Sequence, residues 1–385
     1  KAAYREIVID KSLTIKGEEG QPRPVVYLKR FDLAGTDINV HLEGIEFSGA
    51  TVDSLTWIED TVTLRGEYLL NLTTDLNSAN VLSVKNCIIR NLTRSALRGD
   101  RKAYTVDTIM WDDCIFYDYR GGGDYGPFRT KSQITFNTFI VQNSTFHKML
   151  NKLIDCQDIV SYPMKIFVEN CTFYEWGGGK SGQYLFDIQD NDQAELYIHS
   201  CIFGKTNDDP NATPDPITVN GFRFLPEAYA EITNTAMTVD FVLTDSTYEE
   251  VGWDKTEYNL VDVEPGFAYP DTGNFTLPMG SDLLIMSPSG GIIGDPRWDP
   301  ALVYIPQIPP AGTGMKVYPN PAFGFIHVVV EKQDVLSLYS SIGIKMKEYQ
   351  VNSGLNTLDL EKLPPGFYFL RADSNKEKIS KIIIR

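Results

Sequence analysis

Polar side chains, most of them charged, recur at matched positions of five short segments, and their types could do acid–base or metal chemistry. The segments begin at residues 97, 128, 154, 186 and 217, and each alternates apolar or small residues with polar ones. The second position is Arg98, Arg129, Asp155, Asp187 and Thr218, and the fourth is Asp100, Lys131, Gln157, Gln189 and Asn220. Because side chains alternate faces along a strand, these positions predict one outward stripe of polar groups.

Two reactions of carbohydrates fit these residue types. A lyase must remove the proton beside a uronate carboxylate, which needs a base and a cation that stabilises the enolate. The candidates for base and carboxylate clamp are Arg98, Arg129 and Lys131, and those for Ca²⁺ ligands are Asp155, Asp158, Asp187 and Asp190. A glycoside hydrolase would instead use two of those aspartates as acid and base, or as acid and nucleophile.

Other side chains beside the stripe could hold a sugar without changing it. They are Gln157 and Gln189 in the fourth position, and Tyr125, Trp176 and Tyr184 beside two glycine runs. Exposed aromatic rings can stack on the apolar face of a sugar while their polar atoms stay in contact with water. A charged stripe also suits a soluble surface with no site, because arginine beside aspartate is an ordinary cross-strand pair. Without a complete lyase or hydrolase motif, catalysis, binding and a structural role all stay open.

A recurring phrase supplies the scaffold for this stripe. It reads apolar, any, apolar, any, corner, small, any, large apolar, and its small position falls at residues 45, 87, 114, 144, 171, 201 and 235. The two apolar pairs have opposite parity, so the chain must bend between them. The corner residues are Gly44, Asn86, Asp113, Asn143, Asn170, Ser200 and Asn234, types that tolerate a left-handed backbone. With the polar segment as a third strand, each repeat predicts one coil of a parallel β-helix.

These columns resemble the right-handed, pectate-lyase-like β-helix superfamily over about residues 1–300. The resemblance implies an all-β fold of three strands per coil, and a lyase in it would use arginine or lysine as base. Strands about 4.8 Å apart would spread the stripe from Arg98 to Asp187 over about 14 Å, roughly three sugar rings. The stretch after residue 238, ending in Gly294-Asp295-Pro296-Arg297-Trp298, resembles the closing segment of uncharacterised β-helix proteins from bacterial glycan-use systems. That likeness implies a polysaccharide partner.

Five cysteines could form disulfides or a metal cluster, but their placement favours the interior. Four of them, Cys87, Cys114, Cys171 and Cys201, occupy the small position of the phrase, and Cys156 is at an inward position of a third strand. The odd number, and the lack of a close Cys-Cys or Cys-His pair, predict small buried fillers. In an apolar stack, exchanging Cys171 for serine should destabilise the fold by about 1–3 kcal/mol.

The last part of the chain follows a different pattern. Residues 301–315 are a Pro/Gly linker, and residues 316–385 hold Tyr318-Pro319-Asn320-Pro321, Leu363-Pro364-Pro365-Gly366-Phe367-Tyr368 and a basic end. This region resembles the C-terminal sorting domain of the type IX secretion system of Gram-negative bacteria. The resemblance implies a small β-sandwich, contact with the secretion machinery, export across the outer membrane, and attachment to the cell surface or release from it.

Charge and hydropathy exclude some partners. The net charge is −16; residues 316–385 carry ten Lys/Arg and seven Asp/Glu, or +3, so the first 315 residues carry −19. Nucleic acid is therefore a poor partner, because phosphate binding needs a basic face. No apolar run is long enough for a transmembrane helix. The chain opens at Lys1 without a visible signal peptide, which suggests a mature or trimmed product, and we expect a monomer.

Overall fold

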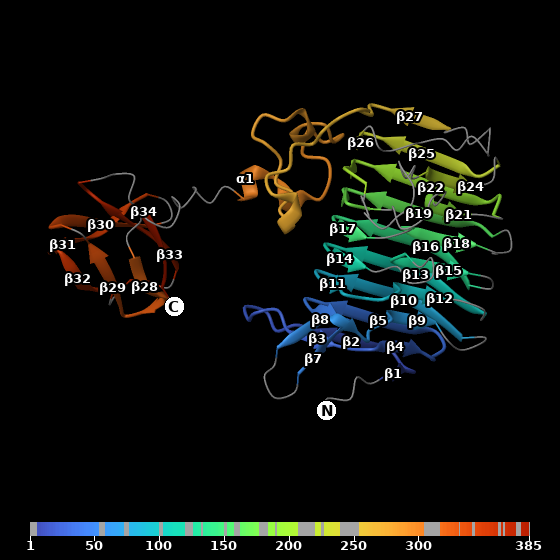
Figure 1. The fold of residues 1–385 in the computed structure, drawn as a ribbon, viewed down its shortest axis with the longest axis horizontal. Coiled ribbons are helices and arrows are strands. Elements are labelled where there is room, and N and C mark those ends of the chain that lie inside the picture. Colours follow the sequence, from blue (N-terminus) through green and yellow to red (C-terminus); the bar gives the residue numbers. More distant parts are fainter. Residues whose placement is uncertain are drawn as a thin grey trace. The chain divides into compact units, whose positions relative to one another are not determined.

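The computed structural model divides the chain into two units, Lys1–Val303 and Tyr304–Arg385, which are described separately (Figure 1). The residues it describes are 6–53, 58–72, 77–99, 103–119, 126–131, 134–149, 152–157, 162–176, 184–188, 191–206, 220–224, 227–238, 254–303, 316–330, 332–340, 343–360, 363–364, 366–374 and 379–384. The predicted linker therefore lies mostly outside the described residues.

The first unit is a parallel β-solenoid, as predicted, whose strands stack into three sheets (Figure 1). Sheet A contains β1 (Glu6–Ile9), β4 (Arg30–Leu33), β9 (Tyr68–Leu72), β12 (Ser95–Gly99), β15 (Phe128–Lys131), β18 (Ile154–Gln157), β21 (Tyr184–Ile188) and β24 (Asn220–Phe224). Within a coil the chain runs through sheet B, then sheet C, then sheet A. Sheet A thus holds the predicted third strands.

Sheets B and C carry the two halves of the recurring phrase. Sheet B contains β2 (Leu13–Lys16), β5 (Ile38–Glu43), β10 (Asn77–Lys85), β13 (Tyr104–Asp112), β16 (Ile134–Gln142), β19 (Met164–Glu169), β22 (Ala194–His199), β25 (Tyr229–Thr233) and β27 (Lys255–Glu257). Sheet C contains β3 (Val25–Tyr27), β6 (Glu46–Ser48), β11 (Ile88–Arg90), β14 (Ile115–Tyr119), β17 (Thr145–Met149), β20 (Thr172–Tyr174), β23 (Ile202–Phe203) and β26 (Ala236–Met237).

The bend predicted between the two halves lies at the corner residue. All seven corner residues have positive φ: Gly44 (68°), Asn86 (49°), Asp113 (56°), Asn143 (50°), Asn170 (50°), Ser200 (52°) and Asn234 (51°). A second left-handed column follows five residues later in four coils, at Asn91, Asp118, Lys148 and Glu175. Lysine and glutamate are unusual there, because a left-handed backbone crowds their Cβ. Residue type therefore predicted the first corner, but it did not predict the second, where lysine and glutamate also occur.

Side chains that point inward form continuous stacks along the solenoid. Phe116, Phe146, Phe173 and Phe203 stack face to face on neighbouring strands of sheet C, with centroids 4.5, 5.1 and 4.7 Å apart. All are buried in a single apolar cluster that extends from the first coils to the last. Each coil buries its apolar face only against its neighbours, as in other solenoids.

The cysteines are free and buried, as predicted, but their column is polar as well as small. The Cys171 thiol donates to Glu169 O at 3.2 Å, two residues back, and Cys87, Cys114 and Cys201 repeat this contact. Ser144 and Thr235 occupy the same column and donate to Gln142 O and Thr233 O. Since a hydroxyl can make the same bond, we expect Cys171→Ser to cost less than the apolar surroundings alone predict.

Two departures from the repeat change the expected boundaries. The long gap between the copies of the phrase at residues 45 and 87 contains a hairpin, β7 (Ala50–Val52) with β8 (Glu59–Leu64). This hairpin is followed by β9 of sheet A. Tyr68 is thereby a buried sheet residue, whereas Trp57 lies outside the described residues. The strand expected from residue 217 is instead β24, which puts Arg223 rather than Thr218 opposite Asp187. Phe222-Arg223-Phe224 has the same alternation, so the pattern alone left the register ambiguous.

The closing segment, residues 258–303, covers the outward face of sheet C. It contains η1 (Pro270–Thr272), η2 (Asp282–Leu284), η3 (Pro296–Trp298) and α1 (Pro300–Val303). Phe267, Phe275 and Ile293 form a satellite apolar cluster with Ile202 and Ala236 of sheet C. An apolar sheet face that would otherwise meet water is buried in this way.

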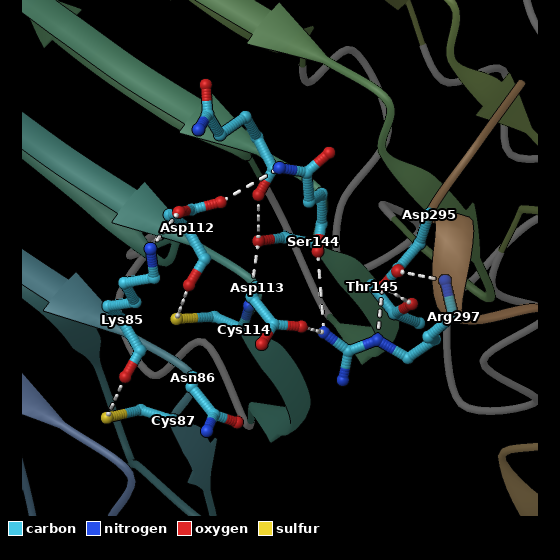
Figure 2. Close-up of polar contacts among 12 residues, drawn as sticks. Lys85, Asn86, Cys87, Asp112, Asp113, Cys114, Ser144, Thr145, Asp295 and Arg297 are labelled. Atoms are coloured by element: carbon cyan, nitrogen blue, oxygen red, sulfur yellow. Dashed lines mark hydrogen bonds and ion pairs between the residues drawn. The ribbon is translucent and has the colours of Figure 1, made fainter.

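Polar contacts fasten the closing segment across several coils (Figure 2). The buried Asp295 carboxylate accepts from Thr145 Oγ1 at 2.6 Å, and Arg297 Nε lies 2.7 Å from its Oδ2. Another Arg297 nitrogen reaches Asp113 Oδ1 at 2.6 Å, and the Asp295 amide donates to Thr172 Oγ1. Burial raises the pKa of Asp295 to about 6, although Arg297 opposes the shift. This cluster is a structural fastening.

The second unit is a small antiparallel β domain with its own core. It contains β28 (Lys316–Phe323), β29 (Phe325–Val330), β30 (Asp334–Ser340), β31 (Lys345–Val351), β32 (Gly354–Asp359), β33 (Gly366–Ala372) and β34 (Ile379–Ile384), in the order β31-β30-β33-β34-β28-β29-β32. Leu338, Leu370 and Ile382 meet Ile326 and Val328 in one buried cluster that is separate from that of the solenoid.

Candidate functional site

The predicted stripe lies in register on sheet A. Arg98 is opposite Arg129, Arg129 is opposite Asp155, and Asp155 is opposite Asp187 on successive strands. Lys131 pairs with Gln157 in the same sheet. The row continues downward through Asn71 and Asp32, whose side chains are joined by a 2.6 Å hydrogen bond. The structure thus aligns Arg98, Arg129, Asp155 and Asp187, whereas Asp100, Asp158 and Asp190 lie outside the described residues.

Cations gather at the middle of this row, and we call Arg94, Arg98, Arg129 and Lys131 the cationic row. The guanidinium of Arg98 lies over the Tyr68 ring, 5.1 Å from its centroid, and Arg94 donates to the Tyr68 hydroxyl at 2.7 Å. A cation over an aromatic ring is held without losing its charge. Arg98, Arg129 and Lys131 are half-buried, and the Nε atoms of Arg98 and Arg129 are buried.

The aspartates of the row are buried rather than displayed on a surface. Asp155 and Asp187 have 1% and 0% of their area exposed, and we call them the buried acidic pair. Lys152 is itself buried; its ammonium contacts Asp187 Oδ2 and lies 3.6 Å from Asp155 Oδ1. Arg129 approaches the other oxygen of Asp155 at 3.5 Å. Two cations therefore neutralise the pair and cover it.

Asp155 is the unusual member of this group. Neither of its carboxylate oxygens makes a hydrogen bond to a residue that the structure describes, although each lies near a cation. Burial raises the pKa of Asp155, the charges of Lys152 and Arg129 oppose that shift, and the charge of Asp187 adds to it. A buried carboxyl group with a raised pKa beside a second carboxylate is the arrangement in which acid–base chemistry is found.

The buried acidic pair does not by itself form a calcium site. Calcium takes six to eight oxygen ligands, whereas Lys152 and Arg129 already occupy the neighbourhood of both carboxylates. Among the described residues no group of three or more His, Cys, Asp or Glu side chains could hold a metal ion. Asp158 and Asp190, the other predicted ligands, lie outside the described residues. Calcium binding stays a prediction.

The predicted sugar contacts fare differently from the charged row. Trp176 is fully buried, packs against Phe203 and donates from its indole nitrogen to Gly204 O at 3.0 Å. Tyr184 is also buried at the start of β21. Both rings belong to the interior, so we do not retain them as sugar contacts. Rings of this size fill space in the core of the solenoid. Tyr125, Gln189 and the side chain of Gln157 lie outside the described residues.

Lys152 is the residue that the sequence did not single out. It lies two residues before β18, outside the alternating segment that defined the stripe. Its ion pair with Asp187 joins positions 35 residues apart, on neighbouring coils. A lysine in a loop just ahead of an acidic strand was the available signal, but such lysines are usually solvated.

Comparison with known proteins identifies the family of the second unit. Residues 316–385 match a secretion system C-terminal sorting domain. The second unit is a type IX sorting domain. The protein is therefore secreted by a Gram-negative bacterium and attached to its cell surface, with the secretion machinery as a partner of the sorting domain. In the described part of the chain no helix is long and apolar enough to cross a membrane.

The matched residues, 316–385, do not include the solenoid. No curated protein matches the chain. The β-helix is confirmed by its three parallel sheets, whereas the resemblance to pectate-lyase-like enzymes stays a prediction. The exported part of the chain is thus a β-solenoid, and the sheet A row is its candidate functional surface.

Proposed function

We propose that the solenoid is a surface-displayed binding domain for an acidic polysaccharide, which it contacts along the cationic row of sheet A. The observation that carries the proposal is a local reversal of charge. Arg94, Arg98, Arg129, Lys131 and Lys152 give five positive charges against two from the buried acidic pair, so the cluster is +3. The whole solenoid with its linker, residues 1–315, carries −19.

The chemistry of the row suits carboxylates spaced along a chain. Arg98 and Arg129 face each other on adjacent strands, and strands are about 4.8 Å apart. A guanidinium can hold a carboxylate through two parallel hydrogen bonds, which fixes its orientation as well as its position. The acidic remainder of the solenoid repels a polyanion, so binding away from the row is disfavoured.

An array of acidic and neutral oligosaccharides tests this function, followed by analysis of any products. We expect the full chain to retain acidic oligosaccharides and to release them unchanged, with affinity that falls as salt is raised. Retention of neutral sugars alone, or of none, would contradict the proposal. A rise in ultraviolet absorbance would show unsaturated products and a lyase, and new reducing ends would show a hydrolase.

One observation favours hydrolysis as a second candidate. The Asp155 carboxylate accepts no hydrogen bond from the described residues, and the neighbouring strand puts Asp187 directly opposite it. A protonated Asp155 could act as the acid while Asp187 acts as base or nucleophile. New reducing ends made by the full chain and lost in Asp155→Asn would support this candidate. Equal product release by both proteins would remove it.

A further inference from the structure

An exposed apolar and basic surface lies on the sorting domain, on the outward side of β33 and β34. Cross-strand pairs put Phe367 opposite Ile383, Phe369 opposite Lys381, and Arg371 opposite Ile379. The alternate residues Tyr368, Leu370 and Ile382 point into the core. We call the six outward residues the β33–β34 face. The strand pairing fixes the relative backbone positions of these six residues.

Its side chains combine apolar area with positive charge. Phe367 is 53% exposed and Ile379 is 44% exposed. The Lys381 ammonium lies 4.4 Å from the centre of the Phe367 ring, and Arg371 lies over the Tyr339 ring of β30 at 4.7 Å. None of the six outward residues is acidic. Exposed apolar groups gathered with arginine and aromatic rings are typical of protein contact surfaces.

The other half of the domain offers a contrast. Phe325 on β29 is similarly exposed, at 46%, but it is opposite Asp359 on β32. Lys347 forms an ion pair with Asp359. Charge there is of both signs, whereas the six residues of the β33–β34 face include two cations and no acidic residue. An acidic partner with an apolar groove would therefore distinguish the two sides of the domain.

We propose that the β33–β34 face is the surface by which the secretion machinery holds this sorting domain, through an acidic, apolar groove in one of its proteins. The family match supplies the existence of that partner, and the face supplies the chemistry that the partner must complement. The proposal concerns export, so it stands or falls independently of glycan binding.

The test uses the full chain in its native host, with display measured by labelling intact cells. Phe367→Ser and Lys381→Glu should each lower display at least tenfold and leave the full chain in the periplasm. Lys381→Arg should restore display because the charge remains. Phe325→Ser is the matched control, with the same exchange at similar exposure on the other side, and it should be displayed normally.

Normal display of Lys381→Glu would overturn the proposal, as would an equal loss in Phe325→Ser. Thermal unfolding of the purified full chains separates misfolding from lost recognition. Lys381 is exposed, so its exchange keeps the core intact even if Phe367→Ser unfolds the domain. A wild-type dimer that these variants dissociate without loss of display would assign the face to self-association instead, against the proposal.

Discussion

At the scale of single residues, this fold depends on side chains that satisfy or strain the backbone at each corner. The small column is a line of thiols and hydroxyls that bond a carbonyl two residues back, as Cys171 and Ser144 do. At the second corner, Lys148 and Glu175 have a left-handed backbone that strains them, whereas Asn91 adopts the same conformation at lower cost. We therefore expect substitutions in the small column to lower stability and a substitution at the second corner to raise it.

Exchanging Cys171 for serine should cost less than about 1 kcal/mol, because the hydroxyl can donate to the same carbonyl. Cys171→Ala should cost more, about 1–2 kcal/mol, since it also leaves a small cavity. Denaturant unfolding of the solenoid under reducing conditions gives both values. A larger loss for serine than for alanine would show that the column is purely apolar.

Replacing Glu175 with asparagine should stabilise the solenoid by about 0.5–1 kcal/mol, because asparagine tolerates a left-handed backbone at lower cost. The control is Glu169→Asn, which changes the same residue type within strand β19, where φ is not positive. The control should be neutral or destabilising. Equal effects at both positions, measured by thermal unfolding, would exclude backbone strain as the cause.

At the scale of elements, the sequence predicted the coil better than the segments that interrupt it. Alternation and corner residues located the strands of sheets B and C, since each coil repeats the same burial. The register of β24 was missed because Ile217-Thr218-Val219 and Phe222-Arg223-Phe224 alternate equally well. The sheet A row was predictable from spacing, but the Lys152–Asp187 contact was not, because it joins residues 35 apart and no local pattern encodes it.

The closing segment should make stability depend on pH through Asp295. Its pKa in the folded protein is raised to about 6 from 3.8, so folding favours the protonated form. This contribution is fully present below about pH 4 and is lost as pH rises to about 6. The free energy of unfolding of the wild type should therefore fall by about 1–3 kcal/mol relative to Asp295→Asn across that range. Parallel pH profiles for the two proteins would refute the assignment.

At the scale of the whole molecule, the solenoid and the sorting domain each have a hydrophobic core of their own. The solenoid and the sorting domain have separate apolar clusters, and the division between them falls after Val303. A chain ending at residue 303 should therefore keep a cooperative unfolding transition, because the core of the solenoid is complete. In the native host that truncated chain should stay in the periplasm. Surface display of the truncated chain would show that export does not depend on the sorting domain.

The measurement that tests the central claim most directly is calorimetric titration of the full chain with an acidic oligosaccharide. The comparison is between the wild type, Arg98→Gln, and Lys165→Gln, an exposed cation of sheet B that pairs with Glu195. We expect Arg98→Gln to weaken binding about tenfold, the effect of losing one charged hydrogen bond, and Lys165→Gln to bind like the wild type. Equal binding by all three proteins would contradict a glycan site on the cationic row of sheet A.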